Sequence, residues 1–125
     1  IRSPLEGDAA YGGMELQILD NEAPIYKDLQ VYQYHGSVYG VIPAKRGYLK
    51  PVGEWNYQEV IADGDHIKVI LNGTTILDGN IREASKNGTI DKRDHPGLLN
   101  KTGHIGFLGH GSLVKFRNIR IKPLK

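Results

Sequence analysis

A carboxylate and a carboxamide stand two residues apart in the segment GMELQILDN, residues 13–21. Apolar residues alternate with Glu15 and Gln17, at Met14, Leu16 and Ile18. This period of two predicts a strand with one buried face, so Glu15 and Gln17 would share the other face about 7 Å apart. Such groups bind sugar hydroxyls, and a carboxylate also serves as a general base or a metal ligand. The alternative is the solvated outer face of an edge strand.

A histidine between two glycines, His110 in the triplet GHG, is the second candidate for proton transfer. Its proton equilibrium lies near neutrality, which suits a general acid or base. Its glycine neighbours let the backbone approach a ligand closely. The alternative is a partly buried histidine whose ring is satisfied by a carbonyl. We therefore take Glu15 and His110 as the candidate catalytic residues.

Six further residues are weaker candidates for contact with a substrate: Gln17, Asp20, His35, Trp55, Lys115 and Arg117. Lys115 and Arg117 alternate with apolar residues and so point away from the core, where they could bind hydroxyls or stabilise an oxyanion; a solvated sheet face is the rival interpretation. Trp55 offers a flat face for a pyranose ring, but it would serve equally well as a core or hairpin anchor. Asp20 could instead start a turn by binding its own backbone.

Composition limits the partners that these residues could serve. The chain has 125 residues, 39% of them hydrophobic and 24% charged, which is typical of one globular domain. Its net charge is only +2 and its cations are scattered, so neither nucleic acid nor an anionic membrane is an expected partner. No apolar run is long enough to span a membrane. The absence of cysteine excludes disulfides and thiolate metal sites.

Short strands dominate the chain, and no stretch convincingly predicts a helix, although a helical turn near residues 26–30 stays open. Residues 54–79 are predicted to form three antiparallel strands joined by turns at Asp63-Gly64 and Asn72-Gly73, because these dipeptides accept positive φ. In the middle strand, one face should carry Ile67, Val69 and Leu71. The other face should carry His66, Lys68, Ile70 and Asn72.

The last 46 or so residues divide into a loop and two strands, by the strand and turn signals used above. Residues 80–102 are polar and aperiodic, which predicts a long surface loop, and such loops are more often functional than idle. Two strands should follow, hinged at GHG, with a bulge near Arg117-Asn118 where the apolar spacing slips by one. Together with sixteen glycines, these elements predict an all-β antiparallel β-sandwich or jelly roll.

Six motifs carry a resemblance that spans nearly the whole chain: GMELQILDN, QYHGSVYG, KPVGEWN, VILNGTTILDG, GHIGFLGHG and VKFRNIRIKPL. In this order they resemble the bacterial 3-keto-disaccharide hydrolase family. The resemblance implies the concanavalin A-like fold, in which two antiparallel sheets pack face to face. It also implies a carbohydrate substrate and a periplasmic or secreted protein.

The chemistry that the resemblance implies begins with a glucoside oxidised at C3. A base removes the acidified C2 proton, a cation or hydrogen-bond donor stabilises the enolate, and the C1 substituent leaves before water adds back. Glu15 and His110 would transfer the protons, and Lys115 or Arg117 would stabilise the charge. A divalent metal is compatible with this route, but the sequence establishes no cofactor. The alternatives are a glycosidase with two carboxylates and a non-catalytic carbohydrate-binding module.

The beginning of the chain departs from the family pattern. Members usually carry some sixty or more residues before this point, and Ile1-Arg2 resembles the end of one of their strands. We therefore interpret residues 1–125 as a single β-sandwich domain that is the C-terminal portion of a larger family domain. A sandwich without those strands exposes unpaired edges. We expect the missing N-terminal segment or another copy of the chain to cover them.

Overall fold

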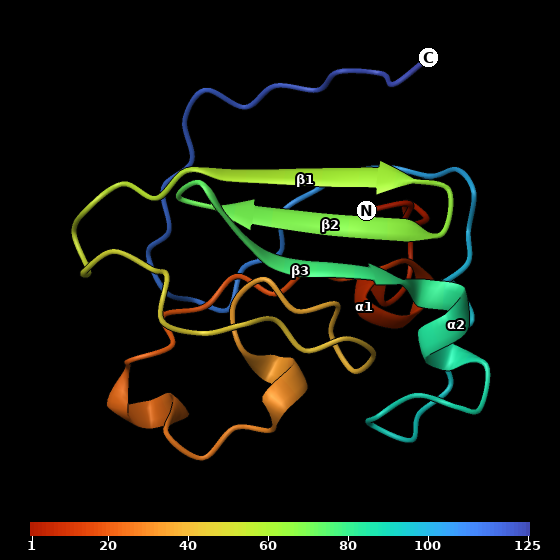
Figure 1. Ribbon diagram of the computed structural model, residues 1–125, viewed down its shortest axis with the longest axis horizontal. Helices are drawn as coiled ribbons and strands as arrows, with labels where there is room; N and C mark the ends of the chain where they lie inside the picture. Colours follow the sequence, from red (N-terminus) through yellow and green to blue (C-terminus); the bar gives the residue numbers. More distant parts are fainter.

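The computed structural model describes residues 1–125, and its regular structure is concentrated in one antiparallel sheet (Figure 1). The sheet has the order β1-β2-β3, with β1 at Gln58–Asp63, β2 at His66–Leu71 and β3 at Thr74–Asn80. A register shift between Val69 and Ile70 bends the pairing of β2 with β3. The predicted meander of three strands is therefore confirmed.

Both hairpins turn through two residues, as their sequences predict, but the first turn lies one residue later than expected. Asn72 and Gly73 have φ values of 50° and 85°, the paired positive values that a type I′ turn requires. At the other turn Asp63 still pairs with His66, so Gly64 and Asp65 form the loop. Gly64 takes a φ of 58° at the first loop position, which glycine adopts without strain.

The inner face of the sheet carries the hydrophobic core. Ile67, Val69 and Leu71 of β2 are buried, while His66, Lys68 and Ile70 face outward, as the alternation predicts. The rest of the core cluster comes from β3, its following helix and three loop segments: Met14, Val38, Val41, Ile76, Leu77, Ile81 and Leu98. Each such aliphatic side chain contributes about 1.5–3 kcal/mol by leaving water.

Two segments, residues 14–19 and 36–42, lie under this face in place of a complete second sheet, and the second of them turns back on itself through a bridge between Val38 and Ile42. They are joined by an isolated antiparallel bridge between Leu16 and Val38. The flanking backbone bonds run from Gln17 N–H to the Ser37 carbonyl (3.0 Å) and from Tyr39 N–H to the Glu15 carbonyl (3.0 Å). The predicted strand at 14–19 is thus reduced to a single bridge with its flanking hydrogen bonds. The all-β class is confirmed, and the second layer of the sandwich is incomplete within these residues.

The helices are short, and each has a local cause. Helix α1 (Ala9–Gly12) is capped by the Asp8 carboxylate, and α2 (Ile81–Ser85) by the Asn80 amide oxygen. Two 3₁₀ turns, η1 (Pro24–Tyr26) and η2 (Val31–Gln33), flank the place where the sequence left a helical turn open. The sequence predicted neither α-helix, because one turn is too brief to show a period. None of the helices has the length and apolar character needed to cross a membrane.

Residues 101–125 form an extended segment without regular strands, so the two strands expected here are not formed. Their backbone pairs with the rest of the chain only at His104, which exchanges two hydrogen bonds with Ser3. A strand needs a neighbour to take its N–H and C=O groups, and none lies beside residues 105–125. The rings of Phe107 and Phe116 stack on each other at 4.1 Å, so the segment folds back around the GHG hinge. The bulge predicted near Arg117-Asn118 is not formed, because no strand pair exists there to carry it, although Asn118 has a φ of 54°.

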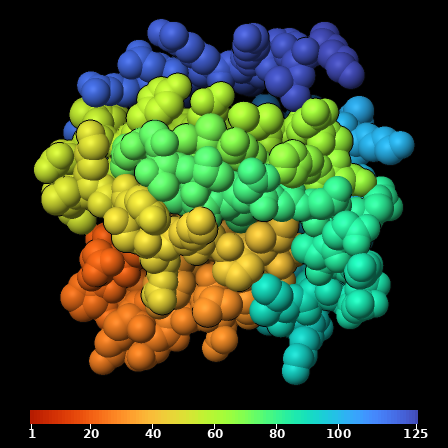
Figure 2. Space-filling model, viewed as in Figure 1, coloured from red at the N-terminus to blue at the C-terminus, as the bar shows by residue number.

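The C-terminal segment leaves a large apolar surface open. Its nine large hydrophobic side chains are between 43% and 85% exposed. Figure 2 shows the end of this segment, in blue, along one edge of the molecule, beyond the sheet. In Figure 1 the same segment passes behind the sheet and then runs on the outer side of β1. Large exposed apolar patches are uncommon on monomers and are typical of interaction sites.

Candidate functional site

The Leu16–Val38 bridge places Glu15 and Tyr39 directly opposite each other. Residues that face each other across an antiparallel pair share one side of it. Val38 is buried in the core and Leu16 packs against it, so Glu15 and Tyr39 lie together on the opposite side, away from the sheet. The sequence-based expectation that Glu15 points away from the core agrees with this geometry.

Glu15 is half-buried, yet no protein donor hydrogen-bonds to its carboxylate. No buried side-chain polar atom of the chain lacks a partner, so the oxygens of Glu15 are open to solvent. Burial is the largest effect, and it raises the pKa of the Glu15 carboxyl. The charge of His110 lowers this pKa, Asp8 raises it, and the amino terminus lowers it. The balance is a raised pKa, which brings a carboxylate closer to the proton affinity that a general base needs.

His110 lies in the exposed C-terminal segment, within electrostatic range of Glu15 and without a hydrogen bond to it. The two candidate catalytic residues are thus near each other, although they are 95 positions apart in the chain. A positive charge near a carboxylate favours the charged form of the carboxylate. A carboxylate and an imidazole within this range of each other can act as a proton acceptor and a proton donor.

Polar and aromatic side chains continue this face beyond Glu15. The Gln33 side-chain amide donates to the Tyr39 hydroxyl (3.1 Å), and the Tyr32 and Tyr39 rings meet edge to face with centroids 5.8 Å apart. The Gln17 amide nitrogen donates to the Gln33 carbonyl (3.0 Å), so this end of Gln17 is already used within the protein. Tyrosine rings of this kind can stack on a sugar ring.

His35, a predicted substrate contact, is instead a buried link between two segments. Its Nδ1 accepts from the Leu19 N–H (3.2 Å), so Nε2 carries the proton and donates to the Gln58 side-chain oxygen (2.7 Å). Burial lowers the pKa of His35 and outweighs the hydrogen bond to Gln58, which would raise it. The lowered pKa keeps the ring neutral. Neither ring nitrogen is free for a ligand.

The remaining predicted contacts lie apart from this face or are engaged elsewhere. Asp20 accepts from the Glu22 N–H (3.1 Å) and forms the turn that the sequence offered as its alternative role. Arg117 covers the ring of Trp55, with its guanidinium carbon 4.0 Å from the ring centroid. Trp55 is 41% exposed, but this cation occupies one of its faces. Lys115 is exposed and makes no ion pair.

The sequence did not single out a buried Asp–His pair in the long loop. His95 Nε2 lies 2.9 Å from Asp91 Oδ2 and 3.0 Å from Oδ1, and the two side chains are only 2% and 4% exposed. Burial alone would raise the pKa of Asp91, but hydrogen bonds from Thr89, His95 and the Arg93 N–H outweigh it and lower that pKa. The i, i+4 spacing of Asp91 and His95 in DKRDH was the one available signal.

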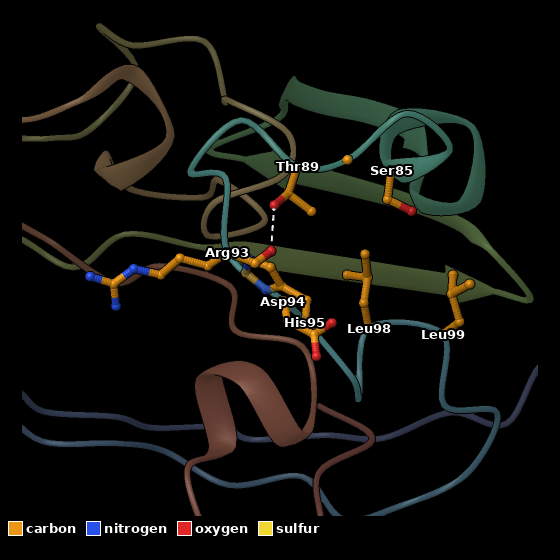
Figure 3. Close-up of a pocket in the computed structure, with 8 residues that line it drawn as sticks. Ser85, Thr89, Arg93, Asp94, His95, Leu98 and Leu99 are labelled. Atoms are coloured by element: carbon orange, nitrogen blue, oxygen red, sulfur yellow. Dashed lines mark hydrogen bonds between the residues drawn. The ribbon is translucent and has the colours of Figure 1, made fainter.

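A shallow pocket of about 200 Å³ opens beside this pair (Figure 3). Its lining comes from the end of α2 and the loop after it: Ser85, Gly88, Thr89, Arg93, Asp94, His95, Leu98 and Leu99. In Figure 3 the hydroxyl of Thr89 bonds to the Arg93 carbonyl (2.8 Å), while the Arg93 side chain extends away from the pocket. No three acidic or histidine side chains of the chain converge as a metal site.

The chain matches one protein family and is similar to known proteins of that kind. The family model described as the 3-keto-alpha-glucoside-1,2-lyase-like domain matches residues 1–122. A 3-keto-disaccharide hydrolase of Bacteroides thetaiotaomicron is 30% identical over 128 residues, covering 88% of this chain and 43% of that protein. A crystal structure of a presumed glycosyl hydrolase from Parabacteroides distasonis superposes with a TM-score of 0.60 at 30% identity, covering 75% of this chain and 49% of that one. The chain therefore spans less than half the length of these relatives.

Proposed function

Because the chain belongs to the 3-keto-alpha-glucoside-1,2-lyase-like family, we propose that it carries the catalytic face of a bacterial glycoside hydrolase. Its substrate class would be 3-keto-glucosides or 3-keto-disaccharides. The family match, the 3-keto-disaccharide hydrolase relative and the glycosyl hydrolase fold neighbour support this substrate class. The finer assignment of roles rests on Glu15 and its surroundings.

The proposed reaction is an elimination followed by a hydration. Glu15 takes the C2 proton, and the C–H electron pair forms the C2–C3 double bond of an enolate as the negative charge moves to the oxygen on C3. The enolate then reforms the ketone and expels the C1 oxygen, which His110 protonates, leaving a C1–C2 double bond. Water adds at C1 and a proton returns to C2, so the net change is hydrolysis of the glycosidic bond.

The observation that carries this proposal is the state of Glu15. Its carboxylate is half-buried, free of protein hydrogen bonds, raised in pKa and within electrostatic range of His110. A carboxylate that served only the fold would be bound by donors, as Asp91 is by Thr89, His95 and Arg93. No protein donor therefore competes with a substrate for the Glu15 carboxylate, and its raised pKa favours the uptake of a proton.

The direct test is turnover of 3-keto-trehalose and a 3-keto-glucoside by the full-length protein, followed as glucose release. Glu15→Gln should abolish turnover and His110→Ala should reduce it strongly. Glu59→Gln, an exposed carboxylate on β1, is the matched control and should leave turnover unchanged. Equal rates in Glu15→Gln and wild type would overturn the proposal.

A carbohydrate-binding module is the second candidate, favoured by the adjacent Tyr32 and Tyr39 rings. Such a module would use aromatic faces to hold a sugar and would need no proton transfer. If the chain has that function, Glu15→Gln should bind sugar with the same affinity as the wild-type protein, and neither protein should hydrolyse a glycoside. The turnover assay therefore separates the two functions.

We further propose that β-strands outside residues 1–125 pair with the segment 105–122. The support is its unpaired extended backbone and its exposed apolar side chains. Without those strands, the isolated chain should self-associate in a sedimentation-velocity experiment, and Phe107→Ser with Ile119→Ser should shift it toward the monomer. A strictly monomeric wild-type chain would contradict this pairing. The proposed location is the periplasm or exterior of a bacterium, which cell fractionation tests.

A further inference from the structure

A buried imidazole lines the pocket beside α2, and one of its nitrogens has no partner in the protein. The His95 side chain is only 2% exposed, and its Nε2 lies 2.9 Å and 3.0 Å from the two carboxylate oxygens of Asp91. No protein group donates to Nδ1. Because no fully buried side-chain polar atom of the chain lacks a partner, the exposed edge of the ring must include Nδ1. His95 lines the pocket, so this edge faces it.

The Asp91 carboxylate decides which nitrogen of His95 carries the proton. It also accepts from the Arg93 N–H (3.1 Å), and the Thr89 hydroxyl lies 2.7 Å from it. Several donors around one carboxylate favour its ionised form, which can only accept hydrogen bonds. In the neutral ring Nε2 therefore carries the proton, and Nδ1 is left as a hydrogen-bond acceptor.

The other polar side chains around this pocket also offer acceptors. The Ser85 hydroxyl already donates to the Ile81 carbonyl (2.8 Å), and the single proton of the Thr89 hydroxyl has two protein acceptors. Asp94 is exposed and its carboxylate makes no ion pair. Arg93, the one strong donor of the lining, extends its side chain away from the pocket (Figure 3). A ligand held by these side chains must therefore donate hydrogen bonds.

The opposite wall of the pocket is apolar. Leu98 and Leu99 line it, and Figure 3 shows their side chains across from Ser85 and Thr89. The volume of about 200 Å³ is below the roughly 300–1,000 Å³ of pockets for drug-sized ligands, so a single ring fits better than an oligosaccharide. A pyranose carries hydroxyl donors on its rim and C–H groups on its faces, which suits both walls. A metal ion does not, because no three acidic or histidine side chains converge.

We infer that this pocket binds one hexose unit of a carbohydrate, with one sugar hydroxyl donating to His95 Nδ1 and another to the Asp94 carboxylate. The inference rests on the proposed function for the carbohydrate class alone, and it does not require Glu15 to act as a base. Asp91 and Tyr11 are positioning residues, because Asp91 fixes the tautomer and the Tyr11 ring packs on the His95 ring with centroids 4.8 Å apart. An acceptor that is already fixed loses little freedom when the sugar binds.

The test is a titration of the full-length, ¹⁵N-labelled protein with methyl α-D-glucopyranoside, followed by NMR of the His95 imidazole nitrogens. The Nδ1 signal should shift as the sugar donates to it, with a Kd on the order of 1 mM for so small a ligand. Asp94→Ala should weaken binding about tenfold, the usual effect of losing a hydrogen bond to a charged group. Asp28→Ala, an exposed carboxylate on another loop, is the matched control and should bind like wild type.

The same titration of Glu15→Gln separates this inference from the proposed function, because the sugar should shift His95 Nδ1 in that variant as it does in wild type. Three results would overturn the inference and leave the proposed function standing: no shift of Nδ1 in wild type, equal affinity in Asp94→Ala and wild type, or an equal shift caused by methylammonium. If the sugar shifts the His95 signal but no 3-keto substrate is turned over, the proposed hydrolase function fails and the sugar site stands.

Discussion

Gly40 is a position where the structure predicts a large effect of a single methyl group. Its φ is 77°, and a Cβ there would lie 2.7 Å from Asp91 Cγ and 2.9 Å from His95 Cε1, and closer still to Asp91 Oδ2. Both neighbours are buried and joined to each other, so neither can rotate away freely. Gly40→Ala should therefore force the Asp–His pair off the strand pair that carries Glu15.

The expected cost has two parts. Holding an L-residue in the left-handed region costs roughly 1–2 kcal/mol. Disrupting one charge-assisted hydrogen bond costs about 1.5–3 kcal/mol more. The sum, about 2.5–5 kcal/mol, is a large part of the 5–15 kcal/mol typical of a folded domain.

Gly73→Ala is the matched control, because Gly73 has a φ of 85° and no atom near its Cβ position. It should show the backbone cost alone. Urea unfolding of both variants, followed by tryptophan and tyrosine fluorescence, gives the two free energies of unfolding. A difference of about 1.5–3 kcal/mol is expected, again from the lost hydrogen bond. Equal destabilisation by the two variants would refute the close packing of Gly40 on the Asp–His pair.

Three further predictions concern pH. Glu15→Gln should raise the free energy of unfolding at neutral pH, because burial raises the pKa of Glu15; the gain should vanish below the ordinary value of 4.5, which urea unfolding at both pH values checks. His110→Gln should move the acidic limb of the kcat/KM profile to higher pH, because the His110 charge lowers the pKa of Glu15. Stability should also fall as the pH drops below 6.5, because burial lowers the pKa of His35, and this fall should be smaller in His35→Gln.

The parts of the fold that the sequence predicts are those decided by neighbours in the chain. The Asn72-Gly73 turn needs only two residues that accept positive φ, and the faces of β2 follow from strict alternation. The strands expected after residue 103 have a similar pattern, but a strand forms only when a second strand takes its hydrogen bonds. That second strand is not among these residues, so the alternating pattern alone could not produce strands here.

The site shows the same division between local and distant causes. The alternation around Glu15 predicts its outward direction, and the bridge to Val38 agrees with it. His35 could not be recognised as structural, because its partner Gln58 lies 23 positions away. The Asp91–His95 spacing was visible, but the sequence does not show that Gly40 and Tyr11 enclose the pair.

The central claim is that Glu15 removes the C2 proton of a 3-keto-glucoside. The most direct measurement is the exchange of that proton with deuterium, followed by NMR on the substrate in D₂O with the full-length protein. Wild type should incorporate deuterium at C2, Glu59→Gln should do so at the same rate, and Glu15→Gln should incorporate none above the uncatalysed background. Exchange in Glu15→Gln at the wild-type rate would contradict the account.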